Sequence, residues 1–207
     1  SIEAAKNIIE KNKVIHLSTD SKKILKICKK YHFFGNDLRP GRLSKDFSLD
    51  IEFLNYTLNF YNDKKILFEY CIILRPTNPL RTKALLNKSY KLFKKNKFDS
   101  LKTIFKAPKT PYKMWFRKGK LIESIIKDKK NEIFNYPRQK LRQAYCQTGT
   151  VEIVRINFKK KLKFFSGNKI MGLSVSEPES VDIDDIKDLK LSNKELKKRN
   201  FIIPQLK

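Results

Sequence analysis

A short apolar run near the middle of the chain is the clearest feature of its hydrophobic pattern. Residues 71–74 (CIIL) contain no polar break, which is too short for a core helix and too continuous for a half-exposed strand. The run predicts a parallel strand buried on both faces. The two prolines in residues 75–80 cannot continue that strand, and Thr82 can cap a helix over 83–95. We therefore expect a strand, a polar turn and a helix.

Apolar runs and helical periodicity alternate along most of the chain. Helices are expected over residues 1–11, 21–31 and 50–61, and strands over 14–17, 100–105, 150–156 and 169–175. The last acidic stretch, residues 180–198, is expected to be a strand end that passes into a helix. This rhythm predicts an α/β fold, a Rossmann-like, doubly wound and mostly parallel sheet with right-handed crossovers.

The rhythm breaks at residue 107. Prolines and a glycine punctuate a section in which 114–116 and 121–126 look like hairpin strands. We interpret residues 107–148 as a small inserted lobe, and residues 1–106 and 149–207 as one α/β domain. The aromatic content of the lobe favours a subunit contact, and packing back on its own domain is the alternative.

The turn after the central strand is the first candidate site. In open α/β sheets, ligands bind beyond the carboxyl ends of the strands. Here that position carries Arg75, Thr77, Asn78 and Arg81. The alternative is a turn with a structural role only.

Four acids in seven positions form the second candidate site: Asp182, Asp184, Asp185 and Asp188. In an extended segment, Asp182 and Asp184 project to the same side and could share one divalent cation, with magnesium the natural choice beside a triphosphate. The competing reading is that Asp184 or Asp185 caps the last helix and the other acids complement its dipole. Both readings can hold together.

Composition narrows the classes of function. A net charge of +26 invites nucleic-acid binding, but the lysines are scattered over every predicted element rather than gathered on one, which argues against that function. Three widely spaced cysteines read as reduced thiols of a cytoplasmic protein. No apolar run is long enough for a membrane span, and no signal peptide is visible.

Several of these segments occur together, in the same order, in a known family. HLSTD (16–20), LRPTNPLR (74–81), PRQKLRQAY (137–145) and SVDIDDIKDLKL (180–191), supported by LRPGRLSKD (38–46) and KTPYKMW (109–115), cover essentially the whole chain. They resemble the acylneuraminate cytidylyltransferases, which make CMP-sialic acid and related sugars.

The resemblance implies a reaction and a set of roles. It implies transfer of CMP from CTP to an acidic nine-carbon, nonulosonic sugar, with release of pyrophosphate. Asp182 and Asp184 would be the catalytic aspartates that bind Mg²⁺. Arg75, Lys113 and Arg138 would contact the sugar, and Arg138 could meet its carboxylate bidentately. The lobe would form a homodimer contact, so that Lys113 and Arg138 could serve the neighbouring subunit. Arg39 and Asp46 would shape the nucleotide side.

The chain also departs from the family. The amino-terminal strand and its Gly- and Ser-containing phosphate loop are absent, and we hypothesise that the chain is a fragment of a longer product that could be inactive by itself. Glu152 stands where an aromatic residue is usual, and is either a surface strand residue or a ligand for sugar hydroxyls. This change weakly favours a legionaminic-type or other nonulosonic acid over N-acetylneuraminate.

Three alternatives remain open: a cytidylyltransferase for another sugar acid, a noncatalytic fragment, and a basic nucleic-acid-binding module. A substrate panel separates the first from the leading reading. Duplex binding that is sensitive to salt and survives Asp182→Asn would favour the last.

Overall fold

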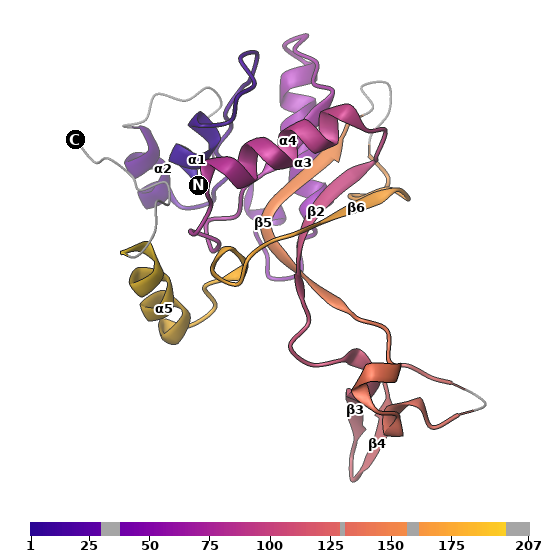
Figure 1. Cartoon of the computed structure of the whole chain (residues 1–207). Coiled ribbons are helices and arrows are strands. Elements are labelled where there is room, and N and C mark those ends of the chain that lie inside the picture. Colours follow the sequence, from indigo (N-terminus) through magenta and orange to yellow (C-terminus); the bar gives the residue numbers. More distant parts are fainter. Residues whose placement is uncertain (30–37, 129–130, 157–161, 198–207) are drawn as a thin grey trace.

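The computed structural model describes residues 1–29, 38–128, 131–156 and 162–197. It contains a four-stranded sheet with helices packed against it and a separate two-stranded hairpin (Figure 1). The helices are α1 (Ile2–Lys6), α2 (Lys22–Lys29), α3 (Asp50–Asn62), α4 (Lys83–Lys95) and α5 (Ile186–Leu196). The strands are β1 (Tyr70–Ile73), β2 (Ser100–Lys106), β3 (Trp115–Lys118), β4 (Leu121–Ser124), β5 (Tyr145–Arg155) and β6 (Ile170–Ser174).

The main sheet has the order β1-β5-β2-β6. Strand β5 pairs antiparallel with both β1 and β2, whereas β2 and β6 are parallel. Strands β1, β2 and β6 therefore run in one direction and β5 runs in the other. The result is a mixed α/β sheet of mostly co-directional strands, and the predicted α/β class is confirmed.

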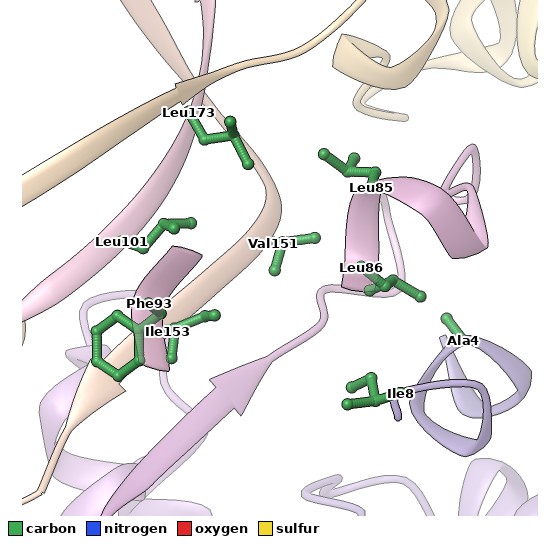
Figure 2. Packing of buried hydrophobic residues seen from close by; sticks show 9 residues of the cluster. All are labelled: Ala4, Ile8, Leu85, Leu86, Phe93, Leu101, Val151, Ile153 and Leu173. Carbon is green, nitrogen blue, oxygen red and sulfur yellow. The ribbon is translucent and has the colours of Figure 1, made fainter. Parts of the chain in front are cut away.

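The core lies between this sheet and the helices α1 and α4. Figure 2 shows side chains from α1, α4 and three strands pointing toward one another. Leu85, Leu86 and Phe93 of α4 pack with Ala4, Ile8, Leu101, Val151, Ile153 and Leu173. Periodic apolar positions on α4 thus bury one helix face against the sheet, which fixes the turn that precedes this helix.

The central elements agree with the sequence prediction. The helix over 83–95 has the predicted bounds, and Thr82 caps it by accepting a hydrogen bond from Leu85 N at 3.0 Å. The predicted β3-β4 hairpin is also present. These elements have strong local signals: a cap residue before a helical period, and two short runs around a glycine turn.

Three sequence predictions are wrong in detail. Residues 14–17 do not form a strand, and nearby only Thr19 and Leu38 make a single bridge. The first helix ends at Lys6 rather than Lys11. At its end, Asn7 Nδ2 donates a hydrogen bond to Glu3 O (2.7 Å) and Lys13 Nζ donates one to Lys6 O (3.0 Å). Side-chain donors satisfy these end carbonyls in place of another helical turn.

The third error concerns the central strand. Its residues are half-buried rather than buried on both faces. Within the described part of the chain, β1 lies at the edge of the sheet and its pairing with β5 is antiparallel. An edge strand is covered by fewer neighbouring residues than a central strand, so the burial predicted from the continuous apolar run was too high. The predicted helix over 21–31 is described only as far as Lys29.

The β3-β4 hairpin lies apart from the main sheet, at the end of two extended connections (Figure 1). Three single-turn helices flank it: η2 (Pro111–Lys113), η3 (Ile133–Asn135) and η4 (Arg138–Lys140). Strand β5 begins at Tyr145 and runs through residue 148, the end of the proposed lobe. The division into 1–106 with 149–207 and an inserted lobe over 107–148 stays a prediction.

None of the helices in the described residues is both long and apolar enough to cross a membrane.

Candidate functional site

Three segments meet at the carboxyl end of β1: the turn 75–81, the middle of β5, and residues 179–183. Asn78, which has no exposed surface, donates from Nδ2 to Thr148 O (2.7 Å) and Val181 O (3.2 Å). Ile183 N donates to Thr77 O (2.8 Å). The polar turn therefore holds the acidic segment before α5 in place, although about 100 residues separate them in sequence.

Arg81 links the turn 75–81 to strand β5. Its side chain is buried, and its guanidinium donates to Thr150 O and Arg75 O. Burial lowers the pKa of Arg81 to about 10, and the negative charge of Asp182 opposes this shift. Arg81 therefore stays protonated near neutral pH and faces the acidic segment. Its contacts, like those of Asn78, support a structural role for the turn; the predicted substrate-binding role of both residues stays a prediction.

Strand β5 is bent where the turn meets it. The β2-β5 register shifts between Lys102 and Ile104, and Gly149 has φ +67°. A Cβ on Gly149 would stand 3.1 Å from both Arg75 Cδ and Asn78 Oδ1. The backbone of the bulge thus needs glycine for its conformation and for the close approach of the turn.

Three buried threonine hydroxyls fill the bulge. Thr148 Oγ1 donates to Thr103 Oγ1 (2.9 Å), Thr150 Oγ1 donates to Glu179 O (2.7 Å), and Thr103 Oγ1 accepts from Val151 N (3.0 Å). These hydroxyls replace the ladder hydrogen bonds that the bulge removes, so the bent strand has few unpaired groups.

Arg75 is the one side chain of the turn that is both charged and partly exposed. Its Nε donates to Glu152 Oε1 at 3.0 Å, and its Nη2 forms an ion pair with Asp50 Oδ2. Desolvation lowers the pKa of Arg75, but the hydrogen bond and charge of Asp50, together with Glu152, raise it above the ordinary value. The guanidinium is therefore held, charged, between two carboxylates.

Glu152 is not a surface strand residue, so that alternative is wrong. Its side chain is 1% exposed, and Lys102 Nζ lies 3.9 Å from its second oxygen, Oε2. Glu152 Oε2 accepts no hydrogen bond from the described residues. A buried carboxylate requires compensating charge, and Arg75 and Lys102 supply it.

The acidic segment divides between two roles. Asp185 caps α5 by accepting hydrogen bonds from Lys187 N (2.7 Å) and Asp188 N (2.9 Å), and Asp188 Oδ2 in turn accepts from Asp185 N (3.2 Å). This capping box confirms the helix-cap reading for two of the four acids.

Asp182 is different, because one of its carboxylate oxygens, Oδ1, is buried and accepts no hydrogen bond from the described residues. Asp184 is exposed. An oxygen of this kind, two residues before a second carboxylate in the sequence, suits a hard divalent cation, which prefers oxygen ligands. The described residues hold no cluster of three or more His, Cys, Asp or Glu, so water and substrate oxygens would have to complete the coordination of Mg²⁺.

The two basic residues of the lobe do not join this cluster within the chain. Lys113 ends η2, and Arg138 begins η4 and donates from Nη2 to Pro108 O (3.3 Å). Both are exposed, and the lobe lies apart from the sheet (Figure 1).

The predicted nucleotide-side residues lie in the loop before α3. Arg39 Nε donates to Ser44 Oγ (3.0 Å), and its guanidinium stacks 5.5 Å above the Phe53 ring. Asp46 is exposed. A cavity of about 400 Å³ lies along the nearby side of α3. Its lining includes Asn55 and Tyr56 but none of the predicted site residues.

Sequence reasoning missed two residues that organise the site. Asp50 was assigned only to the start of a helix, yet it binds Arg75, which is 25 positions away. Glu179 accepts from Thr82 Oγ1 (2.9 Å) and from Ser176 Oγ (2.8 Å) and so links α4 to the acidic segment. The approach of Asp50 to Arg75 has no local pattern, and the capping signal of Thr82 predicted its hydrogen bond from Leu85 N but not its contact with Glu179.

Comparisons with known proteins give one sequence relative and a structural match. The chain is 28% identical over 197 residues to the post-translational flagellin modification protein B of Campylobacter coli, covering 91% of this chain and 79% of the relative. No protein-family model matches. The structure superposes on CMP:2-keto-3-deoxy-manno-octonic acid synthetase complexed with CTP with a TM-score of 0.60 at 10% identity, covering 95% of this chain and 86% of the other. The chain thus has the Rossmann-like α/β fold of that synthetase.

Proposed function

We propose that the chain is a cytidylyltransferase that transfers CMP from CTP to a nonulosonic sugar acid and releases pyrophosphate. The observation that carries this proposal is the buried Oδ1 of Asp182, which lies beside the turn after β1 and accepts no hydrogen bond from the described residues. The fold shared with a CMP:2-keto-3-deoxy-manno-octonic acid synthetase complexed with CTP supports the proposal, and so does the similarity to a flagellin modification protein.

Asp182 and Asp184 are the proposed Mg²⁺ ligands. The cation, when bound, would neutralise the triphosphate and favour departure of pyrophosphate. The residues of the chain position the reactants: the Thr77–Ile183 hydrogen bond holds the acidic segment at the carboxyl end of β1, and Arg75 offers an exposed donor edge at the same end. Positioning of this kind is the main requirement of an in-line displacement at phosphorus.

The sugar is proposed to contact Arg75, Thr77 and the basic residues Lys113 and Arg138. Lys113 and Arg138 lie on the lobe, apart from the sheet, so we propose that they reach the site of a second subunit. A homodimer is therefore part of the proposal. Arg39 and Asp46 are assigned to the nucleotide side on the family resemblance; their loop lies before α3, whose first residue, Asp50, contacts Arg75.

The surface of the lobe supports the dimer. The exposed fractions of Leu121, Phe116 and Ile122 are 75%, 62% and 60%. The pairing places Phe116 and Leu121 on one face of the hairpin and Ile122 on the other. A two-stranded hairpin is marginally stable alone, and apolar side chains on both faces favour burial against a partner. Light scattering should give twice the chain mass, and Phe116→Asp with Leu121→Asp should give the monomer.

The test of the function is pyrophosphate release from CTP and Mg²⁺ with a panel of nonulosonic acids and other sugar acids. Release that requires one sugar, and disappears in the Asp182→Asn, Asp184→Asn double variant, would support the proposal and name the substrate. Binding of CTP is followed in parallel as a shift of the thermal midpoint. If no sugar gives release and CTP with Mg²⁺ leaves the midpoint unchanged, the proposal is rejected.

A further inference from the structure

Arg75 is held by two carboxylates that come from different elements. Asp50, the first residue of α3, pairs with Nη2, and Glu152 of β5 accepts from Nε at 3.0 Å. Two of the three guanidinium nitrogens are thereby engaged. The third, Nη1, makes no hydrogen bond to the described residues. The side chain has 33% of its surface exposed, so Arg75 offers a limited donor edge in a fixed orientation.

Glu152 is buried, whereas Arg75 and Asp50 are partly exposed, so these residues can play different roles. The side chain of Glu152 is 1% exposed, whereas those of Arg75 and Asp50 are 33% and 36% exposed. Glu152 therefore cannot reach a sugar in solution without moving, and it acts through the guanidinium that it holds. This differs from its expected role as a direct ligand for sugar hydroxyls.

The charges of the cluster cancel. Asp50 and Glu152 are balanced by Arg75 and by Lys102, whose Nζ lies 3.9 Å from Glu152 Oε2. A carboxylate that approached Arg75 would find the fork of Nε and Nη2 already occupied by Glu152 and Asp50, and at the remaining N–H groups it would meet the negative charge of Asp50. An uncharged acceptor, such as a hydroxyl or an acylamino carbonyl oxygen, meets neither obstacle.

We infer that Asp50 and Glu152 are positioning residues that fix Arg75, and that Arg75 so held recognises an uncharged acceptor of the sugar rather than its carboxylate. The inference rests on the proposed function for its substrate but not for its geometry. It makes Arg75 a specificity residue for the hydroxyl or acylamino substituents, and it leaves the sugar carboxylate to other basic groups.

The geometry is tested without catalysis. In a ¹H–¹⁵N spectrum, the Nε–H signal of Arg75, assigned by its loss in Arg75→Gln, should exchange slowly with water in the wild-type chain. It should exchange at least about tenfold faster in Asp50→Asn and in Glu152→Gln, since each variant removes one carboxylate acceptor. Unchanged protection in both variants would overturn the positioning role. Asp63→Asn, at the other end of α3, is the matched control.

Kinetics then test the consequence. Asp50→Asn should raise KM for the sugar by roughly tenfold and leave KM for CTP unchanged. In the Arg75→Gln background the same substitution should have no further effect, because a positioning residue acts only through its partner. An equal effect in both backgrounds would contradict the inference.

A sugar whose carboxylate is replaced by a carboxamide identifies the recognised group. The loss of kcat/KM caused by this replacement should be the same in the wild type and in Arg75→Gln. A smaller loss in Arg75→Gln would mean that Arg75 reads the carboxylate, and would overturn the inference. If the wild type releases no pyrophosphate with any sugar, the proposed function fails by itself, while the exchange measurement still decides whether Arg75 is held.

Discussion

Gly149 and Asn78 approach so closely that a Cβ added to the glycine would stand 3.1 Å from Asn78 Oδ1. Gly149 also has φ +67°, where side chains are strained. Gly149→Ala should therefore lower the free energy of unfolding by about 2 to 4 kcal/mol, the sum of a strained backbone and a displaced buried turn. Urea denaturation measures the loss.

A matched control separates the two causes. Gly119, in the β3-β4 turn, has φ +60° but no heavy atom within 4 Å of an added Cβ. Gly119→Ala should cost only the backbone strain, about 1 to 2 kcal/mol. If both variants lost the same free energy, the close approach of Asn78 to β5 would not contribute to stability.

The three cysteines should differ sharply in reactivity. Cys146 is exposed and Cys28 is buried. Burial raises the pKa of the Cys71 thiol to about 12, so almost no thiolate is present at pH 8, and the thiolate is the nucleophile. Titration of the native chain with a disulfide reagent at pH 8 should show one fast thiol.

Cys146→Ser should remove that fast phase and leave the slow ones. A fast phase that persists in Cys146→Ser would place the reactive thiol elsewhere and contradict the burial of Cys28 and the raised pKa of Cys71.

Glu10 should make stability depend on acidity. Tyr90 and Tyr70 both donate to Glu10 Oε2, the latter at 3.0 Å, and Asn12 N donates to Oε1 at 3.1 Å. The hydrogen bond from Tyr90, then that from Asn12, lower the pKa of Glu10 to about 2 from 4.5. A depressed carboxyl pKa adds stability that is complete above the unfolded pKa and is lost as the pH falls from about 4.5 to about 2.

The measurement is the difference in thermal midpoint between the wild type and Glu10→Gln across this pH range. The wild type should be the more stable at pH 6, and the difference should shrink as the pH falls below 4.5. Glu3→Gln, whose partner is the exposed Lys6, is the control. A difference that stayed constant with pH would contradict the assigned role of Glu10.

The sequence predicted the elements with local signals and missed those that depend on distant partners. Thr82 before a helical period predicted the start of α4 correctly. The run at 71–74 predicted a strand, but its antiparallel partner lies 79 or more positions away and has no local signature. The same holds for the candidate site. The motif residues could be chosen from the pattern, whereas the carboxylates of Asp50 and Glu152 on Arg75 follow from the packing of α3 and β5.

Of the acids before α5, Asp185 should contribute to the stability of the fold and Asp182 to the activity. Asp185 caps the helix through the N–H groups of Lys187 and Asp188, so Asp185→Ala should lower the free energy of unfolding by about 1 kcal/mol. Asp182→Asn should change the free energy of unfolding little, because it neutralises an oxygen that is buried and unpartnered among the described residues but also removes the negative charge that faces Arg81.

The rate of pyrophosphate release should depend on Asp182 more than on Asp185. Asp182→Asn should reduce kcat by at least about a hundredfold, the order of loss when one preorganised group facing the transition-state charge is removed. Asp185→Ala should reduce activity far less, since its carboxylate is engaged by the helix. Denaturation and pyrophosphate release on the same two preparations test both statements. If Asp182→Asn unfolded the chain as Asp185→Ala does and left kcat unchanged, Asp182 would be a structural acid and not a metal ligand.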